Sequence, residues 1–107
     1  MQALAKRRDP DMARLEQRAA EAARLMKLLA NENRLLILCR LAAEREMSVG
    51  EIAGAVGLSQ SALSQHLAKM REEDLVATRR EAQTVFYRIA NPDTGRILAL
   101  LKDIYCP

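Results

Sequence analysis

Short polar side chains gather on one face of the segment from residue 59 to residue 70. Leu63, Leu67 and Met70 recur at spacings of four and three, which is typical of the buried face of a helix. At about 100° per residue, the opposite face carries Ser61, Ser64, Gln65, Ala68 and Lys69. Hydroxyl and amide groups hydrogen-bond to base edges in a DNA major groove, and glutamine suits adenine. The pattern favours a helix that reads double-stranded DNA; the alternative is a solvated polar face that carries little charge.

Cys39 and Cys106 are the two thiols of the chain. A thiolate attacks oxidised sulfur, and a second thiol close in space can resolve the product. Cys39 lies among leucines and alanines, where a cysteine is by default a small core hydrophobe. Lys102, one turn before Cys106, favours the Cys106 thiolate, whereas Asp103 opposes it. The function of the pair therefore depends on whether the fold brings the two thiols together.

A helix-turn-helix would position the polar face. Ser48 and Glu51 have the spacing of a capping box at the start of a first short helix, and Gly57 ends it. Ser59 then caps a second helix after a short turn. Two short helices with a glycine in the turn between them predict this motif.

Beyond residue 75 the apolar period changes from helical to strand-like. Residues 76–81 and 85–89 alternate in the manner of strands, with a turn near Ala82 and Gln83. A two-stranded hairpin after a recognition helix predicts a winged helix. We expect its polar residues to contact phosphates or a minor groove, unless the hairpin face is merely solvated; they are Arg79, Arg80, Gln83 and Arg88.

Apolar helices flank this motif. A heptad-like series from Met12 to Leu29 predicts one long helix that begins at Pro10, and residues 31–44 predict a centrally buried helix. Asn91 and Pro92 start a last helix that is apolar on nearly all sides and must be covered. We expect the first and last helices to form a homodimer, whose two recognition helices would fit an inverted-repeat operator.

Length and composition set the outer bounds. The 107 residues predict a single domain at 10–107 behind a flexible basic arm at 1–9, and a fold that is mainly α with one β-hairpin. The net charge of +3 suits a polyanion. No apolar run approaches the length of a membrane span and no signal peptide is visible, which predicts a cytoplasmic protein with reduced thiols. We expect no cofactor and no enzyme activity, because the sequence offers no paired carboxylates in a plausible pocket and no Gly-rich phosphate loop.

Four stretches carry a resemblance to a known family: NRLLILCRL, GLSQSALSQHLAKMREEDLV, TRREAQTVFYRI and the closing apolar helix. From about Ala20 to Cys106 the chain resembles the ArsR/SmtB family of bacterial winged-helix repressors. The resemblance implies a dimer that blocks a promoter and leaves it when an inducer binds, most often a metal ion. By position it implies DNA contacts for Gln60, Ser61, Ser64 and Gln65.

The metal-binding half of the family pattern does not carry over. Where arsenic and cadmium sensors have Cys-Val-Cys, this chain has Ser48, Val49 and Gly50, and its last helix has no histidine. His66, on the recognition helix, fits a packing or phosphate role better than a metal ligand. We therefore predict no metal site, and keep a metal sensor that uses the two cysteines as an alternative.

The cysteines instead match the pair of the BigR- and SqrR-like subgroup, whose members sense persulfides. In that interpretation reactive sulfur species link Cys39 and Cys106 within one subunit by a di- or polysulfide bridge, and the protein releases DNA. A repressor that senses nothing is the remaining alternative.

Overall fold

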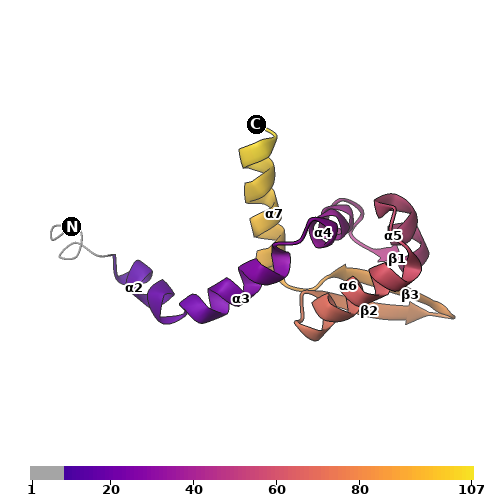
Figure 1. Ribbon diagram of the computed structural model, residues 1–107, viewed down its shortest axis with the longest axis horizontal. Coiled ribbons are helices and arrows are strands. Elements are labelled where there is room, and N and C mark those ends of the chain that lie inside the picture. The colour runs from indigo at the N-terminus through magenta and orange to yellow at the C-terminus, as the bar shows by residue number, and fades with distance from the viewer. Residues whose placement is uncertain (1–8) are drawn as a thin grey trace. The chain divides into compact units, whose positions relative to one another are not determined.

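The computed structural model describes residues 9–107 (Figure 1). The chain divides into two compact units, Met1–Asn31 and Glu32–Pro107. Residues 1–8 of the predicted basic arm lie outside the described residues. The arm, and the single domain at 10–107, stay predictions.

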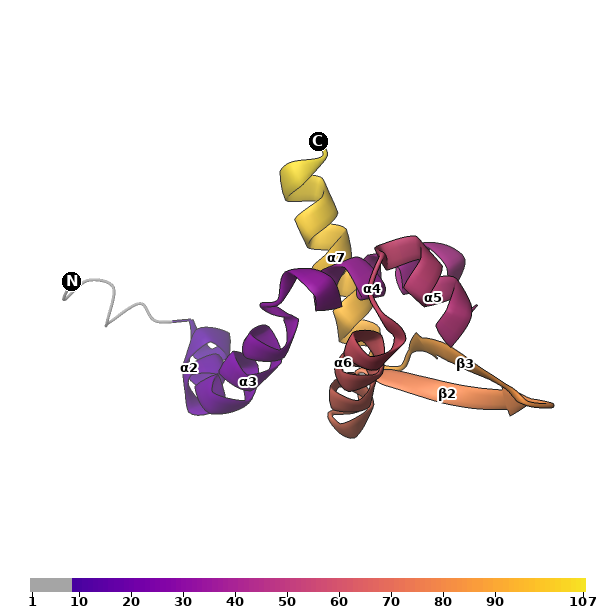
Figure 2. The same ribbon diagram turned by 45° about the vertical axis from the view of Figure 1, so that its right-hand side comes forward.

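The first unit contains two helices where the sequence predicted one. Helix α2 spans Pro10–Gln17 and α3 spans Ala19–Leu29. The Asp9 carboxylate caps α2 by accepting from the Asp11 amide at 2.8 Å, as the Asp-Pro start predicted. Arg18 leaves the helical region at φ −111° and ψ 19°, and the chain bends there (Figure 2). The prediction of one long helix was wrong, because two successive helices that share an apolar face have the same heptad spacing.

The second unit is the winged helix-turn-helix. Its helices are α4 Glu32–Glu44, α5 Val49–Val56, α6 Gln60–Glu72 and α7 Pro92–Tyr105, and its strands are β1 Met47–Ser48, β2 Val76–Glu81 and β3 Thr84–Ile89. The antiparallel sheet has the order β1-β3-β2. The predicted class, mainly α with a winged hairpin, is confirmed, and the two-residue β1 adds a strand that the sequence did not predict.

The predicted helix signals hold at α5 and α6. Ser48 Oγ accepts from the Glu51 amide at 3.2 Å, and the Glu51 carboxylate accepts from the Ser48 amide at 2.8 Å. Gly57 ends α5 at φ 69°, where a side chain would be strained, and Ser59 Oγ accepts from the Ala62 amide. The boundaries of the helix-turn-helix therefore follow from local chemistry.

The core of the second unit is aliphatic and lies between α4, α5, α6 and the start of β2. Its fully buried members are Ile37, Leu38, Leu41, Ile52, Leu63, Leu67, Met70 and Leu75. Helix α4 buries one stripe only: Leu36 is 45% exposed and Cys39 is exposed. The expectation of a centrally buried helix was wrong here, because apolar composition does not say how many neighbours a helix has.

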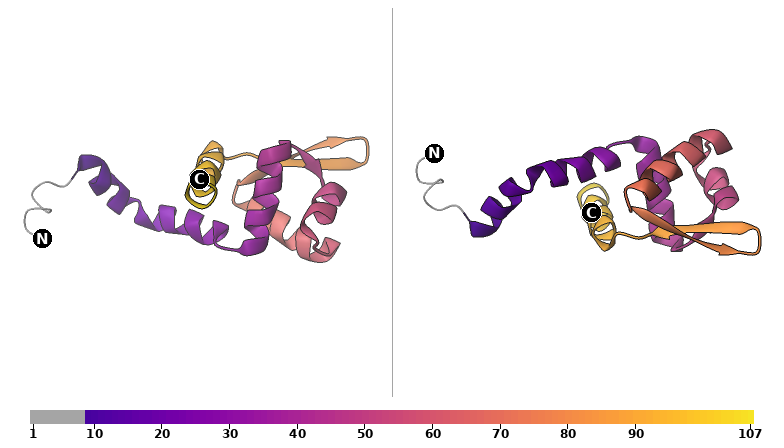
Figure 3. Two further views of the ribbon diagram at one scale, coloured as in Figure 1. Left: turned by 90° about the horizontal axis from the view of Figure 1, so that it is seen from above. Right: turned by 90° about the horizontal axis from the view of Figure 1, so that it is seen from below.

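Strands β2 and β3 extend beyond the helices as the wing (Figure 3). Ala82 and Gln83 form the predicted turn, with Ala82 at φ 55°. The C-terminal half of α7 also projects away from α4, α5 and α6 (Figures 1 and 2). Three of its apolar side chains are exposed, Leu100 by 59%, Ile104 by 56% and Tyr105 by 78%.

Thr94 in the first turn of α7 is fully buried, and its hydroxyl has no hydrogen-bond partner among the described residues. A buried hydroxyl without a partner costs about 1–3 kcal/mol. We expect Thr94→Val, which replaces the hydroxyl by a methyl group, to stabilise the fold by about 1 kcal/mol and raise the Tm in a thermal melt. Thr94→Ser, the control, keeps the hydroxyl and should lower the Tm; a lower Tm for Thr94→Val would contradict the reasoning.

Candidate nucleic-acid interface and thiols

The predicted reading face of α6 is open to solvent. Leu63, Leu67 and Met70 are at most 1% exposed and anchor the helix in the core. The side chains of the other face are all exposed: Gln60, Ser61, Ser64, Gln65, Ala68 and Lys69. Ser59 fixes the first turn and its hydroxyl lies 3.4 Å from that of Ser61. The structure therefore brings the predicted α6 residues onto one surface, free of acidic groups until Glu72.

An open hollow of about 450 Å³ lies between α6 and the wing. It is lined by Ser64, Ala68, Arg71 and Glu72 of α6 and by Tyr87 of β3. Arg71 and Tyr87 are polar groups that the sequence analysis missed. Arg71 could have been found from spacing. It follows Ala68 by three positions and Ala68 follows Ser64 by four, so the three residues share one face of the helix.

The strand register separates the predicted wing residues onto two faces. Arg79 is paired with Phe86 and Arg80 with Val85, so that the two arginines point to opposite sides of the hairpin. Arg80 shares the face of Tyr87, which borders the hollow beside α6. Arg79 and Arg88 lie on the other face, and Gln83 lies exposed at the turn. The four residues therefore do not form one surface.

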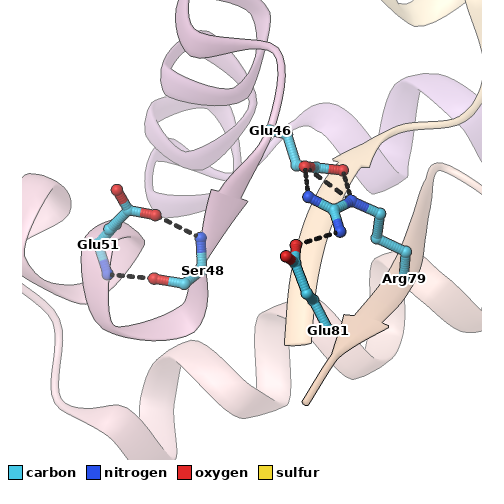
Figure 4. A network of polar contacts seen from close by, with 5 residues as sticks. All are labelled: Glu46, Ser48, Glu51, Arg79 and Glu81. Carbon is cyan, nitrogen blue, oxygen red and sulfur yellow. Dashed lines mark hydrogen bonds and ion pairs between the residues drawn. The ribbon is translucent and has the colours of Figure 1, made fainter. Parts of the chain in front are cut away.

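Arg79 is bound within the protein (Figure 4). Its Nε donates to both carboxylate oxygens of Glu46, at 2.9 and 2.8 Å, and its Nη2 donates to Glu46 Oε1 at 2.6 Å. Its Nη1 donates to Glu81 Oε2 at 2.8 Å. The guanidinium carbon also lies 4.6 Å from the centre of the Phe86 ring, which is cation–π distance.

These contacts set the charge states around the hairpin. The hydrogen bonds from Arg79, with the positive charge of Arg88 adding to them, hold the pKa of Glu46 below its usual range. Glu46 and Glu81 in turn raise the pKa of Arg79. Glu46 is therefore ionised at neutral pH, and its carboxylate offsets the Arg79 charge.

Both cysteines are free and exposed. Cys39 lies on the solvent side of α4, so the default interpretation of a core cysteine was wrong. Cys106 follows α7, and its backbone amide donates to the Lys102 carbonyl at 2.7 Å. The two thiols belong to the same compact unit as α6 and the wing.

His66 forms a hydrogen bond within the protein. His66 is half-buried, and its Nδ1 accepts from Arg34 Nε at 3.4 Å. Within residues 9–107, no three His, Cys, Asp or Glu side chains gather closely enough to hold a metal ion. The metal-sensing alternative therefore rests on the family resemblance alone.

The sequence and this geometry agree with known proteins. Residues 31–78 match a family model described as a bacterial regulatory protein of the arsR family. The HTH-type transcriptional regulator YgaV of Escherichia coli is 45% identical over 97 residues, which cover 91% of this chain and 98% of that protein. The chain belongs to the ArsR family.

Solved structures of similar proteins extend the likeness to the whole fold. Reduced HlyU from Vibrio cholerae has a TM-score of 0.80 at 49% identity, and the match covers 88% of this ArsR-family chain and 98% of that chain. The transcriptional repressor BigR from Xylella fastidiosa has a TM-score of 0.83 at 38% identity, covering 90% and 97%. The predicted ArsR/SmtB resemblance is confirmed, and BigR is among the similar structures.

The relatives of this ArsR-family protein are transcriptional regulators, and the names of two of them differ in the sign of regulation. HlyU of Vibrio cholerae is named a transcriptional activator, whereas BigR is named a repressor. No helix formed by residues 9–107 is both long and apolar enough to cross a membrane. The roles of individual DNA-contacting residues and of the thiols stay predictions.

Proposed function

We propose that this ArsR-family protein is a repressor that binds an inverted-repeat operator as a homodimer and releases it when persulfides link Cys39 and Cys106. The observation that carries the proposal is the exposure of both thiols in the unit that also carries the recognition helix. An exposed thiol is open to attack by a small oxidant, whereas a core cysteine is not. Binding to a chromosomal operator would place the protein in the cytoplasm.

The DNA half of the proposal rests on α6 and the hairpin. Helix α6 would enter the major groove with Ser61, Ser64 and Gln65 toward the base edges. Lys69, Arg80 and Gln83 would contact the backbone or a minor groove. Arg71 and Tyr87, on either side of the hollow, add two donors for a phosphate, although the Glu72 carboxylate opposes an anion there.

The homodimer is supported by apolar surface in each unit. Leu100 and Ile104 lie one turn apart on α7, and Met12, Leu15 and Met26 are exposed in the first unit. Solvent contact at so many large apolar side chains favours a covering partner, and a second copy of the chain is the simplest one.

The sulfur chemistry balances with persulfide as the oxidant. One thiolate attacks the sulfane sulfur of RSSH, forms Cys–S–SH and releases RSH. The second thiolate attacks the inner sulfur of that group, forms the disulfide and releases H₂S. Each further RSSH lengthens the bridge by one sulfur and releases one further RSH, so that a polysulfide can span a gap too wide for a disulfide.

One anaerobic experiment tests both halves. Selection from random duplexes should yield an inverted repeat, and the reduced protein should then be exposed to a persulfide donor or to peroxide. We expect persulfide to remove two hydrogens from the intact mass and to add one sulfur for each step beyond the disulfide. Peptides should map the link to Cys39 and Cys106, and operator binding should fall in parallel. Gln65→Ala should bind the same repeat about tenfold less tightly while keeping the sulfur chemistry, because one bidentate base contact contributes about 1–3 kcal/mol.

The outcomes separate the alternatives. An unchanged mass after persulfide treatment would rule out persulfide sensing and leave a metal sensor or a repressor without an inducer. Equal bridging by peroxide would indicate a general oxidant sensor. Failure to enrich any duplex would overturn the DNA-binding half.

A further inference from the structure

The Arg79 guanidinium is already bound by groups of the protein, which does not favour a role in binding a DNA phosphate. Glu46, Glu81 and the face of Phe86 surround its guanidinium, and the two carboxylates offset its charge. It also lies on the face of the hairpin opposite Tyr87, away from the hollow beside α6. Both observations separate Arg79 from Arg80, its neighbour on the same strand.

Glu46 lies in the short link between α4 and β1. Helix α4 ends at Glu44, Arg45 follows it with φ 70°, and Glu46 directly precedes the short strand β1. In β1, Met47 pairs with Tyr87 and Ser48 pairs with Phe86, next to the Arg79 site. Ser48 also caps α5. The carboxylate that binds Arg79 therefore belongs to the junction between α4 and β1, next to the start of α5.

We propose that Arg79 is a positioning residue, which ties the projecting wing to the α4–β1 junction and so sets its angle for the operator, and that it is not a DNA contact. A two-stranded ribbon twists strongly and is only marginally stable alone. The pair Arg79 and Phe86 lies midway along β2 and β3, where a fixed point limits the movement of the tip. The inference rests on the operator binding proposed above.

Conservative variants distinguish positioning from a phosphate contact. Lysine keeps the positive charge of arginine but not the planar fork that binds a carboxylate with two donors. We expect Arg79→Lys to weaken operator binding roughly 3- to 10-fold, as loss of a surface ion-pair network allows. A phosphate contact would tolerate this change, because lysine also binds phosphates. Arg40→Lys, the control, is an exposed arginine of α4 with no proposed role in DNA binding, and it should bind within about twofold of wild type.

In Glu46→Gln, masking and positioning predict opposite changes in operator affinity. Removing a carboxylate reduces repulsion of DNA and, if Glu46 merely masked Arg79, would tighten binding. Positioning predicts the reverse, a 3- to 10-fold loss that is no greater when Arg79→Lys is added. The slope of log affinity against log salt concentration should be unchanged in Glu46→Gln, because no phosphate contact is lost.

Hydrogen exchange gives a readout without DNA. Amides of residues 78–87 should exchange faster in Arg79→Lys and Glu46→Gln than in wild type and Arg40→Lys. Tighter operator binding by Glu46→Gln, unweakened binding by Arg79→Lys, or unchanged exchange in both variants would overturn the inference. If wild type binds no selected duplex, the proposed function fails by itself, and exchange alone decides whether Arg79 holds the wing.

Discussion

Replacement of Cys39 by serine is expected to abolish the release of operator DNA by persulfides and to leave the affinity of the reduced protein within about twofold of wild type. Cys39 is exposed, so the substitution opens no cavity in the core and exchanges one small polar group for another. Without Cys39 a persulfide on Cys106 has no intramolecular thiol to close the bridge. The Cys106 persulfide should therefore persist until dithiothreitol reduces it.

The size of this effect follows from population arithmetic. A change from mostly bound to mostly free operator needs several kcal/mol of difference between the two states, which a covalent bridge can supply and a single modified thiol cannot. The measurement is fluorescence anisotropy of labelled operator before and after persulfide treatment. Cys106→Ser should behave like Cys39→Ser, whereas Ala42→Ser, an exposed position on the same helix, should respond like wild type. Full release by either cysteine variant would contradict the dithiol mechanism.

Replacement of Ile104 by glutamate is expected to convert the protein to a monomer and to lower operator affinity by at least about 100-fold, because each half-site then binds without the advantage of the other. Ile104 is 56% exposed on a single chain, so a charge there costs little in the monomer. In a dimer interface the same carboxylate would be buried without a partner.

Sedimentation velocity measures the oligomeric state, and anisotropy measures operator affinity. Lys102→Gln is the matched control, because it changes the net charge by the same amount. Lys102 is exposed and lies on the other side of α7 from Ile104. It should remain dimeric. A dimeric Ile104→Glu would place the interface elsewhere, and a wild-type monomer that binds the full operator tightly would remove the need for one.

Local chemistry explains how much of the fold was predictable. The capping box of Ser48 and Glu51, the stop at Gly57 and the buried spacing of Leu63 and Leu67 are encoded within a few residues, and the structure reproduces them. Strand β1 was missed because two residues carry no period of their own and pair only when β3 is present beside them. The bend at Arg18 was missed because the apolar spacing continues through it.

The site was predictable in part for the same reason. A single helix decides which face Ser64 and Gln65 occupy, so their exposure followed from spacing. The exposure of Cys39 depends on which neighbours surround α4, and apolar composition does not report this. Arg79 and Glu46 are 33 positions apart, so no local pattern links them. Because Arg79 binds a distant carboxylate, its local sequence alone could not distinguish an internal ion pair from a proposed contact with DNA.

The order of the strands also affects whether the sheets of two molecules can pair edge to edge. Within the described residues, β2 has no strand on its outer side, and such an edge invites pairing with a strand of another molecule. Its outer half is Arg79, Arg80 and Glu81, and on the other side of the sheet β1 pairs with only Phe86 and Tyr87 of β3. The charged side chains along the β2 edge discourage edge-to-edge aggregation. We therefore expect the projecting wing not to pair edge to edge with the β2 edge of another molecule.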